Sequence, residues 1–120
     1  MNRSQLAINS ISTRGPMEET LAGYAAAGFR NVEFYLGHVK EYLAQGYSLS
    51  DFRRLLDGHQ LRFIGGFETQ LEGFSAGEAR AANHKQVVEN AKLIAELGGT
   101  ALVVGTDGPA GATEDPLGLL

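Results

Sequence analysis

The sequence predicts an α/β fold in which four parallel strands alternate with helices. Two observations predict this class. Four short apolar runs of strand length occur along the chain, and the segments between them carry apolar residues at helical spacing. Strands that alternate with helices pair in parallel through right-handed crossovers, because a parallel neighbour needs a connection long enough to return to the starting edge.

The predicted strands are the runs LAINSIS, NVEFYL, LRFIGGF and ALVVGT, at residues 6–12, 31–36, 61–67 and 101–106. The first predicted helix opens at Pro16, a residue suited to a first helical turn. It carries Glu18 and Glu19 where the helix dipole favours anions, and it stops at Gly28.

Two more helices are predicted downstream. The second starts from Ser48, with Asp51 three residues later as a capping-box match, and ends at Gly58. The third covers about 79–97 and stops at the glycine pair that follows. Its predicted apolar stripe has five members: Val87, Val88, Ala91, Ile94 and Ala95.

The last residues indicate a fourth helix. Asp115 and Pro116 look like an N-cap and a first helical position, and leucines follow them over 117–120. A complete (β/α)8 TIM barrel needs about 250 residues, roughly twice this chain. We therefore expect residues 1–120 to form one domain, the N-terminal half of such a barrel truncated inside its fourth helix. The strands should lie in sequential order, with three complete helices on the outer face. A natural four-unit protein is the alternative.

Composition restricts the classes of partner. The net charge is −4 and the basic residues are scattered, so the sequence offers no basic face for nucleic acid. There is no cysteine, which permits a reducing compartment. The N-terminal apolar run is broken by Asn9 and Ser10, unlike a signal peptide, and no stretch has the length of a membrane span. We expect a cytoplasmic protein with no membrane partner.

Glu33 is the residue that most needs an explanation. In NVEFYL, Val32, Phe34 and Leu36 share one face, so Glu33 and Tyr35 share the other. If the first face packs under helices, the second faces the barrel interior or its mouth, where binding groups gather in this architecture. Glu33 is then either a ligand contact or a structural carboxylate held by neighbouring side chains. Tyr35 either stacks on a ligand or packs inside.

Polar residues follow the other predicted strands at the same end. The candidates are Asn9, Ser10, Glu68, Thr106 and Asp107. This position favours ligand contact in parallel α/β folds, whereas Ser10 and Thr106 also suit loop caps and Asp107 in TDGP also suits a turn.

The three histidines give no complete metal site. None belongs to a two-histidine helical motif. His38 is predicted in the loop after the second strand, at the mouth, where it is a candidate ligand contact. His59 is expected to have a structural role at a helix end, near terminal carbonyls, and His84 is expected on the surface. The loop GTDGPAG lacks the Lys-Ser/Thr ending of a P-loop.

The strands INSIS, GFRNVEFY and LRFIGGFE, with the helix–strand pair NAKLIAELGGTALVVGTDGP, resemble the xylose-isomerase-like TIM-barrel superfamily of sugar phosphate isomerases and epimerases. The resemblance covers nearly the whole chain. It implies that Glu33 matches the second-strand glutamate of that family and that Tyr35 faces the sugar. It also implies a Mn, Mg, Co or Zn ion, held by acidic residues and a histidine from later strands.

By this resemblance the parent protein isomerises or epimerises a sugar, sugar phosphate, keto-sugar or cyclitol by proton transfer next to a carbonyl. The predicted substrate contacts are Glu33 and Tyr35, which the resemblance implies, and Asn9, His38, Glu68 and Asp107, which follow from their positions at strand ends and in the loops after strands. The chain by itself would hold no complete metal shell and would have weak activity or none. A second copy of the chain is a further candidate partner.

Two other functions stay open at this point. The apurinic-endonuclease branch of the superfamily would hydrolyse a phosphodiester, but the acidic balance disfavours DNA. A complete flavodoxin-like or receiver domain would be a binding module without catalysis. A receiver needs clustered acidic residues after its first strand, and NSIS has none.

Overall fold

The computed structural model describes residues 2–106 of the chain. Within that range the sheet has four parallel strands in the order β1-β2-β3-β4. They are β1 (Ala7–Asn9), β2 (Asn31–Tyr35), β3 (Arg62–Phe67) and β4 (Ala101–Val103). The α/β class and the sequential strand order are thus confirmed. The predicted fourth helix lies outside the described residues.

All four strands are shorter than predicted, β2 and β3 by one residue each and β1 and β4 by more. The first ends at Asn9 because the side chain of Asn9 accepts a hydrogen bond from the backbone N–H of Ile11 at 2.8 Å and caps the 3-10 helix η2 (Ser10–Ser12). A shorter 3-10 helix, η1 (Arg3–Gln5), precedes β1. The fourth strand ends at Val103 rather than at Thr106. Local capping therefore limits β1, where the apolar pattern alone suggested a longer strand.

Three predicted helices are present as α1 (Met17–Ala26), α3 (Leu49–Gly58) and α4 (Gly77–Glu96). A further helix, α2 (Leu36–Ala44), was not predicted. It begins directly after β2, so Leu36 is helical and not the last strand residue. Its buried residues Leu36, Val39 and Tyr42 have helical spacing, but no polar N-cap separates them from the strand. Without that signal, the strand pattern of NVEFYL concealed the start of the helix.

The predicted capping box of α3 is confirmed. The backbone N–H of Asp51 donates to the Ser48 hydroxyl at 3.1 Å, and the backbone N–H of Ser48 donates to the Asp51 carboxylate at 2.8 Å. The Arg54 guanidinium also contacts this carboxylate. The backbone hydrogen bond at Ser48, followed by the Arg54 and Ser48 side-chain bonds, lowers the pKa of Asp51.

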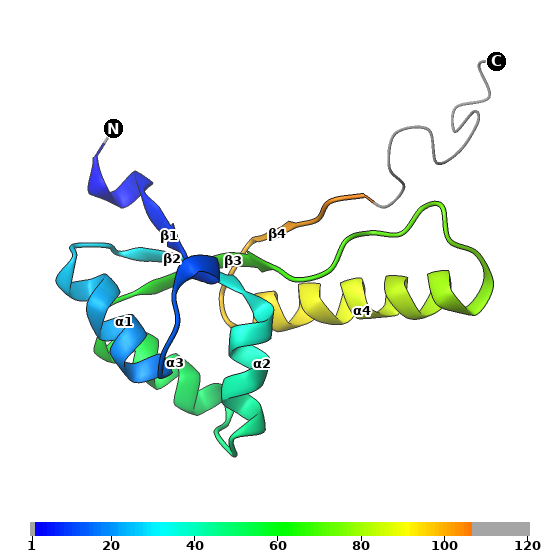
Figure 1. The fold of residues 1–120 in the computed structure, drawn as a ribbon. Coiled ribbons are helices and arrows are strands. Elements are labelled where there is room, and N and C mark those ends of the chain that lie inside the picture. Colours follow the sequence, from blue (N-terminus) through cyan, green and yellow to red (C-terminus); the bar gives the residue numbers. More distant parts are fainter. Residues whose placement is uncertain (1, 107–120) are drawn as a thin grey trace.

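Figure 1 shows the helices gathered on one side of the sheet. The sheet residues on that side, Val32, Phe34 and Phe63, are almost completely buried. Phe34 lies edge-on to Phe52 of α3, with 5.5 Å between the ring centroids, and stacks on Phe63 at 5.8 Å. Each such aromatic pair adds about 0.5–1.5 kcal/mol beyond its buried area. The core therefore lies between the sheet and the helices.

The opposite side of the sheet is not covered by helices within residues 2–106 (Figure 1). We call it the open face; its members at the C-terminal ends of the strands are Asn9, Glu33, Tyr35, Phe67 and Val103. Strand register places them side by side, because Asn9 pairs with Glu33, Tyr35 with Phe67, and Phe67 with Val103. They are partly or well exposed, with Val103 at 53%.

Two glycines allow β3 to fit between its neighbours. A Cβ atom on Gly65 would lie 2.3 Å from the Ala101 carbonyl oxygen, and one on Gly66 would lie 2.7 Å from the Phe34 carbonyl oxygen. The register of β2 and β3 shifts beside them, between Val32 and Glu33. A side chain at either glycine would therefore force neighbouring backbone apart.

The predicted apolar stripe of α4 was wrong in three members, which are exposed: Val88, Ala91 and Ala95. Ile94 is buried as predicted, but Asn83 and Asn90 occupy the other buried positions. Asn83 accepts from the Glu72 backbone N–H at 2.9 Å and donates to the Gln70 carbonyl at 2.8 Å. Because such hydrogen bonds satisfy the amides, polar residues can take the buried side of this helix.

None of the helices within residues 2–106 combines the length and the apolar character needed to cross a membrane.

Candidate functional site

The C-terminal ends of β1 and β2 bring together Asn9 and Glu33. The Asn9 side-chain amide donates a hydrogen bond to Glu33 Oε1 at 2.6 Å, while its oxygen caps η2. Both side chains are partly buried on the open face. The neutral amide of Asn9 thus holds the Glu33 carboxylate in place through a charge-assisted hydrogen bond. No hydrogen-bond partner of the second carboxylate oxygen is found within residues 2–106.

Ser10 connects β2 to the histidine of the site. Ser10 is 1% exposed, and its hydroxyl accepts from the Tyr35 backbone N–H at 2.9 Å and lies 3.0 Å from His38 Nδ1. His38 was predicted in a loop, and that placement was wrong: it lies in the first turn of α2, because the helix starts at Leu36. In either tautomer this bond engages Nδ1, and no hydrogen bond of Nε2 is found among the described residues.

An aromatic surface adjoins this cluster. The Tyr35 ring lies edge-on to His38, with 5.1 Å between the ring centroids, and tilts against Phe67 at 5.7 Å. Tyr35 and Phe67 belong to the open face, next to Val103. Aromatic rings beside hydrogen-bonding groups suit a ligand that is apolar on one side and polar on the other.

Glu68 belongs to a second polar cluster, formed with α2 and α4. Glu68 Oε1 accepts a hydrogen bond from Lys40 Nζ at 2.5 Å. Lys40 Nζ also donates to Asn90 Oδ1 at 2.8 Å. Sequence reasoning missed Lys40 because α2 itself was missed, and it missed Asn90 because an apolar stripe was expected. No spacing in the sequence indicates this contact, because Asn90 is buried only through partners from other elements.

The remaining candidates are less informative. Thr106 is exposed and pairs through its backbone with Leu71 in an isolated parallel bridge. Asp107 lies outside the described residues. The structure thus brings Asn9, Glu33, Tyr35 and His38 together, and it places Glu68 in the separate cluster with Lys40.

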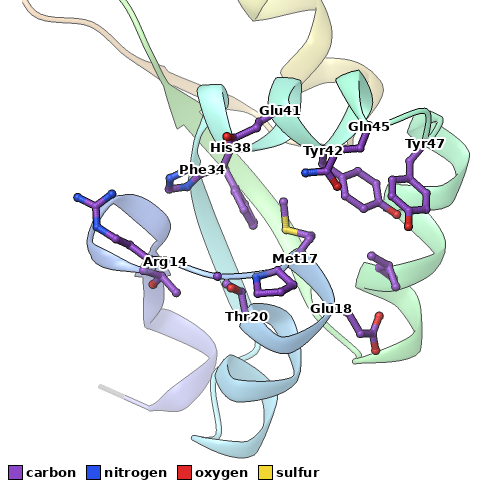
Figure 2. Close-up of a pocket in the computed structure, with 14 residues that line it drawn as sticks. Arg14, Met17, Glu18, Thr20, Phe34, His38, Glu41, Tyr42, Gln45 and Tyr47 are labelled. Atoms are coloured by element: carbon purple, nitrogen blue, oxygen red, sulfur yellow. The ribbon is translucent and has the colours of Figure 1, made fainter.

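Two cavities border these groups. One of about 470 Å³ lies at the ends of β3 and β4 and is lined by Phe67, Glu68, Thr69, Gln70, Val103 and Gly105. The other, of about 740 Å³, lies between α1, α2 and α3. Figure 2 shows His38, Tyr42 and Tyr47 among its lining residues. Burial, and then the nearby Asp51, Tyr47 and Glu18, raise the pKa of Tyr42 from its ordinary value.

The other histidines do not join the site. His59 at the end of α3 has a structural contact as expected, but its imidazole meets Glu18 of α1, with 3.0 Å between Nε2 and Oε1, rather than helix-terminal carbonyls. His84 is exposed, and its Nε2 lies 2.8 Å from the Glu72 carbonyl oxygen. Within residues 2–106, no three His, Asp or Glu side chains are grouped as metal ligands.

No protein-family model matches the chain, and no curated protein shows significant similarity to it. The fold and the site together define the structural class of the protein. The chain is an α/β protein whose parallel sheet carries a cluster of polar and aromatic side chains at its C-terminal edge.

Proposed function

We propose that this chain contributes the first four strand–helix units of a (β/α)8-barrel isomerase or epimerase. Its substrate would be a sugar, sugar phosphate, keto-sugar or cyclitol, and the reaction a proton transfer next to a carbonyl. The observation that carries the proposal is the Asn9–Glu33 pair on the open face, beside the Tyr35 ring. In parallel α/β folds, ligands bind at the carboxyl ends of the strands, which is where this pair lies.

The sheet supports the barrel part of the proposal. Its strands follow chain order, and the helices cover one side only (Figure 1). Parallel sheets are ordinarily buried on both faces, so the open face requires a cover. In a barrel, further strands would continue the sheet beyond β4 and turn the open face into the barrel interior. A flavodoxin-like sheet instead has the order 2-1-3-4 with helices on both faces. The observed order and the one-sided helices therefore support the flavodoxin-like alternative less well.

The chemistry rests on residues of this chain. Glu33 would accept a hydroxyl hydrogen bond or a proton from the substrate through the oxygen that Asn9 does not contact. His38 would present Nε2, since Ser10 engages Nδ1. Tyr35 and Phe67 would contact the C–H face of the sugar ring.

A divalent ion, Mn, Mg, Co or Zn, is part of the proposal for the parent enzyme. Residues 2–106 do not assemble a ligand set for it. The proposed ligands are acidic residues and a histidine on strands beyond this sheet.

Deuterium incorporation tests the proposed function. The chain, together with whatever its open reading frame encodes after Leu120, is incubated with Mn²⁺ in D₂O and with ketoses, aldoses, their phosphates and keto-inositols. Proton NMR should show loss of the signal of the hydrogen on the carbon next to the carbonyl of one substrate, as deuterium replaces it. Glu33→Gln should reduce the rate, and Glu19→Gln, on the exposed side of α1, should leave it unchanged.

Each contrary outcome is informative. No incorporation into any substrate would count against the proposed reaction. Incorporation at an equal rate in Glu33→Gln would remove Glu33 from the substrate contacts and leave the reaction class in place.

A further inference from the structure

Lys40, Glu68 and Asn90 form a polar network that joins three elements. Lys40 lies in α2, Glu68 directly follows β3, and Asn90 lies in α4. The Lys40 ammonium contacts Glu68 Oε1 at 2.5 Å and Asn90 Oδ1 at 2.8 Å, and Asn90 Nδ2 donates to Glu68 Oε1 at 3.3 Å. The three side chains therefore fix one another.

The network is too costly to be a neutral surface feature. Asn90 is 1% exposed, and the Glu68 side chain is 19% exposed. Burying a charged or amide group without partners is unfavourable, and a leucine at position 90 would fill a buried helix position without that cost. Gln86 completes the amide contacts by donating to Asn90 Oδ1 at 3.0 Å. The contacts from Lys40 and Asn90 hold the Glu68 carboxylate in one orientation.

The orientation leaves one carboxylate oxygen unused. Both contacts to Glu68 go to Oε1, and no hydrogen-bond partner of Oε2 is found within residues 2–106. Glu68 also lines the cavity of about 470 Å³ at the ends of β3 and β4. Phe67 and Val103 of the open face line the same cavity. A fixed acceptor group thus borders a cavity that is lined by both apolar and polar residues.

We propose that Glu68 binds a hydroxyl group of a neutral polyol in this cavity, and that Lys40 and Asn90 are the residues that position its carboxylate. The proposal rests on the proposed sugar-binding function and adds a second binding point to the Asn9–Glu33 pair. Lys40 compensates the charge of Glu68, so the carboxylate serves as an acceptor for a neutral O–H donor and not as a cation site. Phe67 and Val103 match the C–H groups of the polyol.

The test is an NMR titration of the ¹⁵N-labelled full chain with D-fructose as the neutral polyol probe. We expect amide shifts at residues 67–70 and at Gly105. Glu68→Gln and Lys40→Met should each weaken binding by about tenfold, the effect of losing one charge-assisted hydrogen bond. The double variant should bind no more weakly than Glu68→Gln alone, because Lys40 acts through Glu68. Lys85→Met, at an exposed position of α4, is the matched control.

A readout without ligand tests the positioning directly. The side-chain amide resonances of Asn90 should move in both Lys40→Met and Glu68→Gln, and they should stay in place in Lys85→Met. If Lys40→Met does not fold, Glu68→Gln still tests both the shift of the Asn90 amide and the loss of fructose binding.

The contrary outcomes separate this inference from the proposed function. Fructose-induced shifts confined to residues near Asn9 and His38 would overturn the Glu68 site and leave the proposed function in place. No shift anywhere in the chain would overturn the Glu68 site, and the deuterium-incorporation experiment would decide the proposed function separately. A Lys40→Met variant that melts at a lower temperature but binds fructose like the wild type would show that Lys40 only stabilises the fold.

Discussion

The Asn9 side-chain amide lies 2.6 Å from Glu33 Oε1 and joins β1 to β2 across the open face. Because Asn9 is the donor, the amide oxygen of a glutamine at position 33 can accept the same hydrogen bond. Glu33→Gln should therefore change the free energy of unfolding by less than about 1 kcal/mol. Urea unfolding followed by circular dichroism measures this change. A larger loss of stability would assign Glu33 to the scaffold, as a carboxylate whose charge the fold needs.

Gly66→Ala should destabilise the sheet. The added Cβ would lie 2.7 Å from the Phe34 carbonyl oxygen and 2.8 Å from Leu36 Cδ2, and overpacking of this kind costs about 1–3 kcal/mol. Gly23→Ala in α1 is the matched control. Nothing lies within 4 Å of its added Cβ, so helix propensity should make that variant more stable by about 0.5–1 kcal/mol. Equal stability of the two variants would contradict the close approach at β3.

Asp51 should make stability depend on pH in the acidic range. Its pKa is lowered in the folded state, so its contribution is present above the ordinary aspartate pKa and is lost as the pH falls through the lowered value. Asp51→Asn should therefore lose stability near neutral pH and show a smaller further loss on acidification. Thermal melts across the acidic range test this, with Asp57→Asn, on an exposed residue of the same helix, as control. Parallel pH profiles for Asp51→Asn and the wild type would refute it.

The open face should make the chain associate with itself. Phe67 and Val103 place apolar surface there, and β4 has no strand partner on its outer edge within residues 2–106. Val103→Lys should reduce association, because a charged residue on an exposed edge strand opposes further pairing. Val88→Lys, which changes a similarly exposed valine on α4, should not. Sedimentation velocity at several concentrations distinguishes them, and a monomeric wild type would refute the prediction.

The sequence was sufficient to predict the class, the strand order and the capping box of α3, because these depend on local spacing and on short polar signals. It was insufficient for α2, where Leu36 continues the strand pattern and no cap marks the change. It was also insufficient for α4, where partners from distant segments decide whether an asparagine can be buried. Asn90 is satisfied by Lys40, 50 positions away in the chain, and helical spacing alone carries no record of that contact.

The candidate site, too, was predictable where local spacing decides and not where distant contacts decide. Glu33 was placed on the correct face by the two-residue period of its strand, and register then brought it to Asn9. The position of His38 relative to Tyr35 depended on the unpredicted helix. Strand residues were thus accessible to sequence reasoning. Of the helix residues, His38 was a candidate but was expected in a loop, and Lys40 and Asn90 were not predicted.

No loop separates β2 from α2, so the number of residues between Tyr35 and His38 decides where the His38 side chain lies. A single inserted residue between Tyr35 and Leu36 would turn every later side chain of α2 by about 100° around the helix axis. His38 would then leave the Ser10 hydroxyl, and Lys40 would leave Glu68, in one step. Both polar clusters therefore depend on the same junction between β2 and α2. At this junction, related sequences should tolerate substitutions far more readily than insertions or deletions.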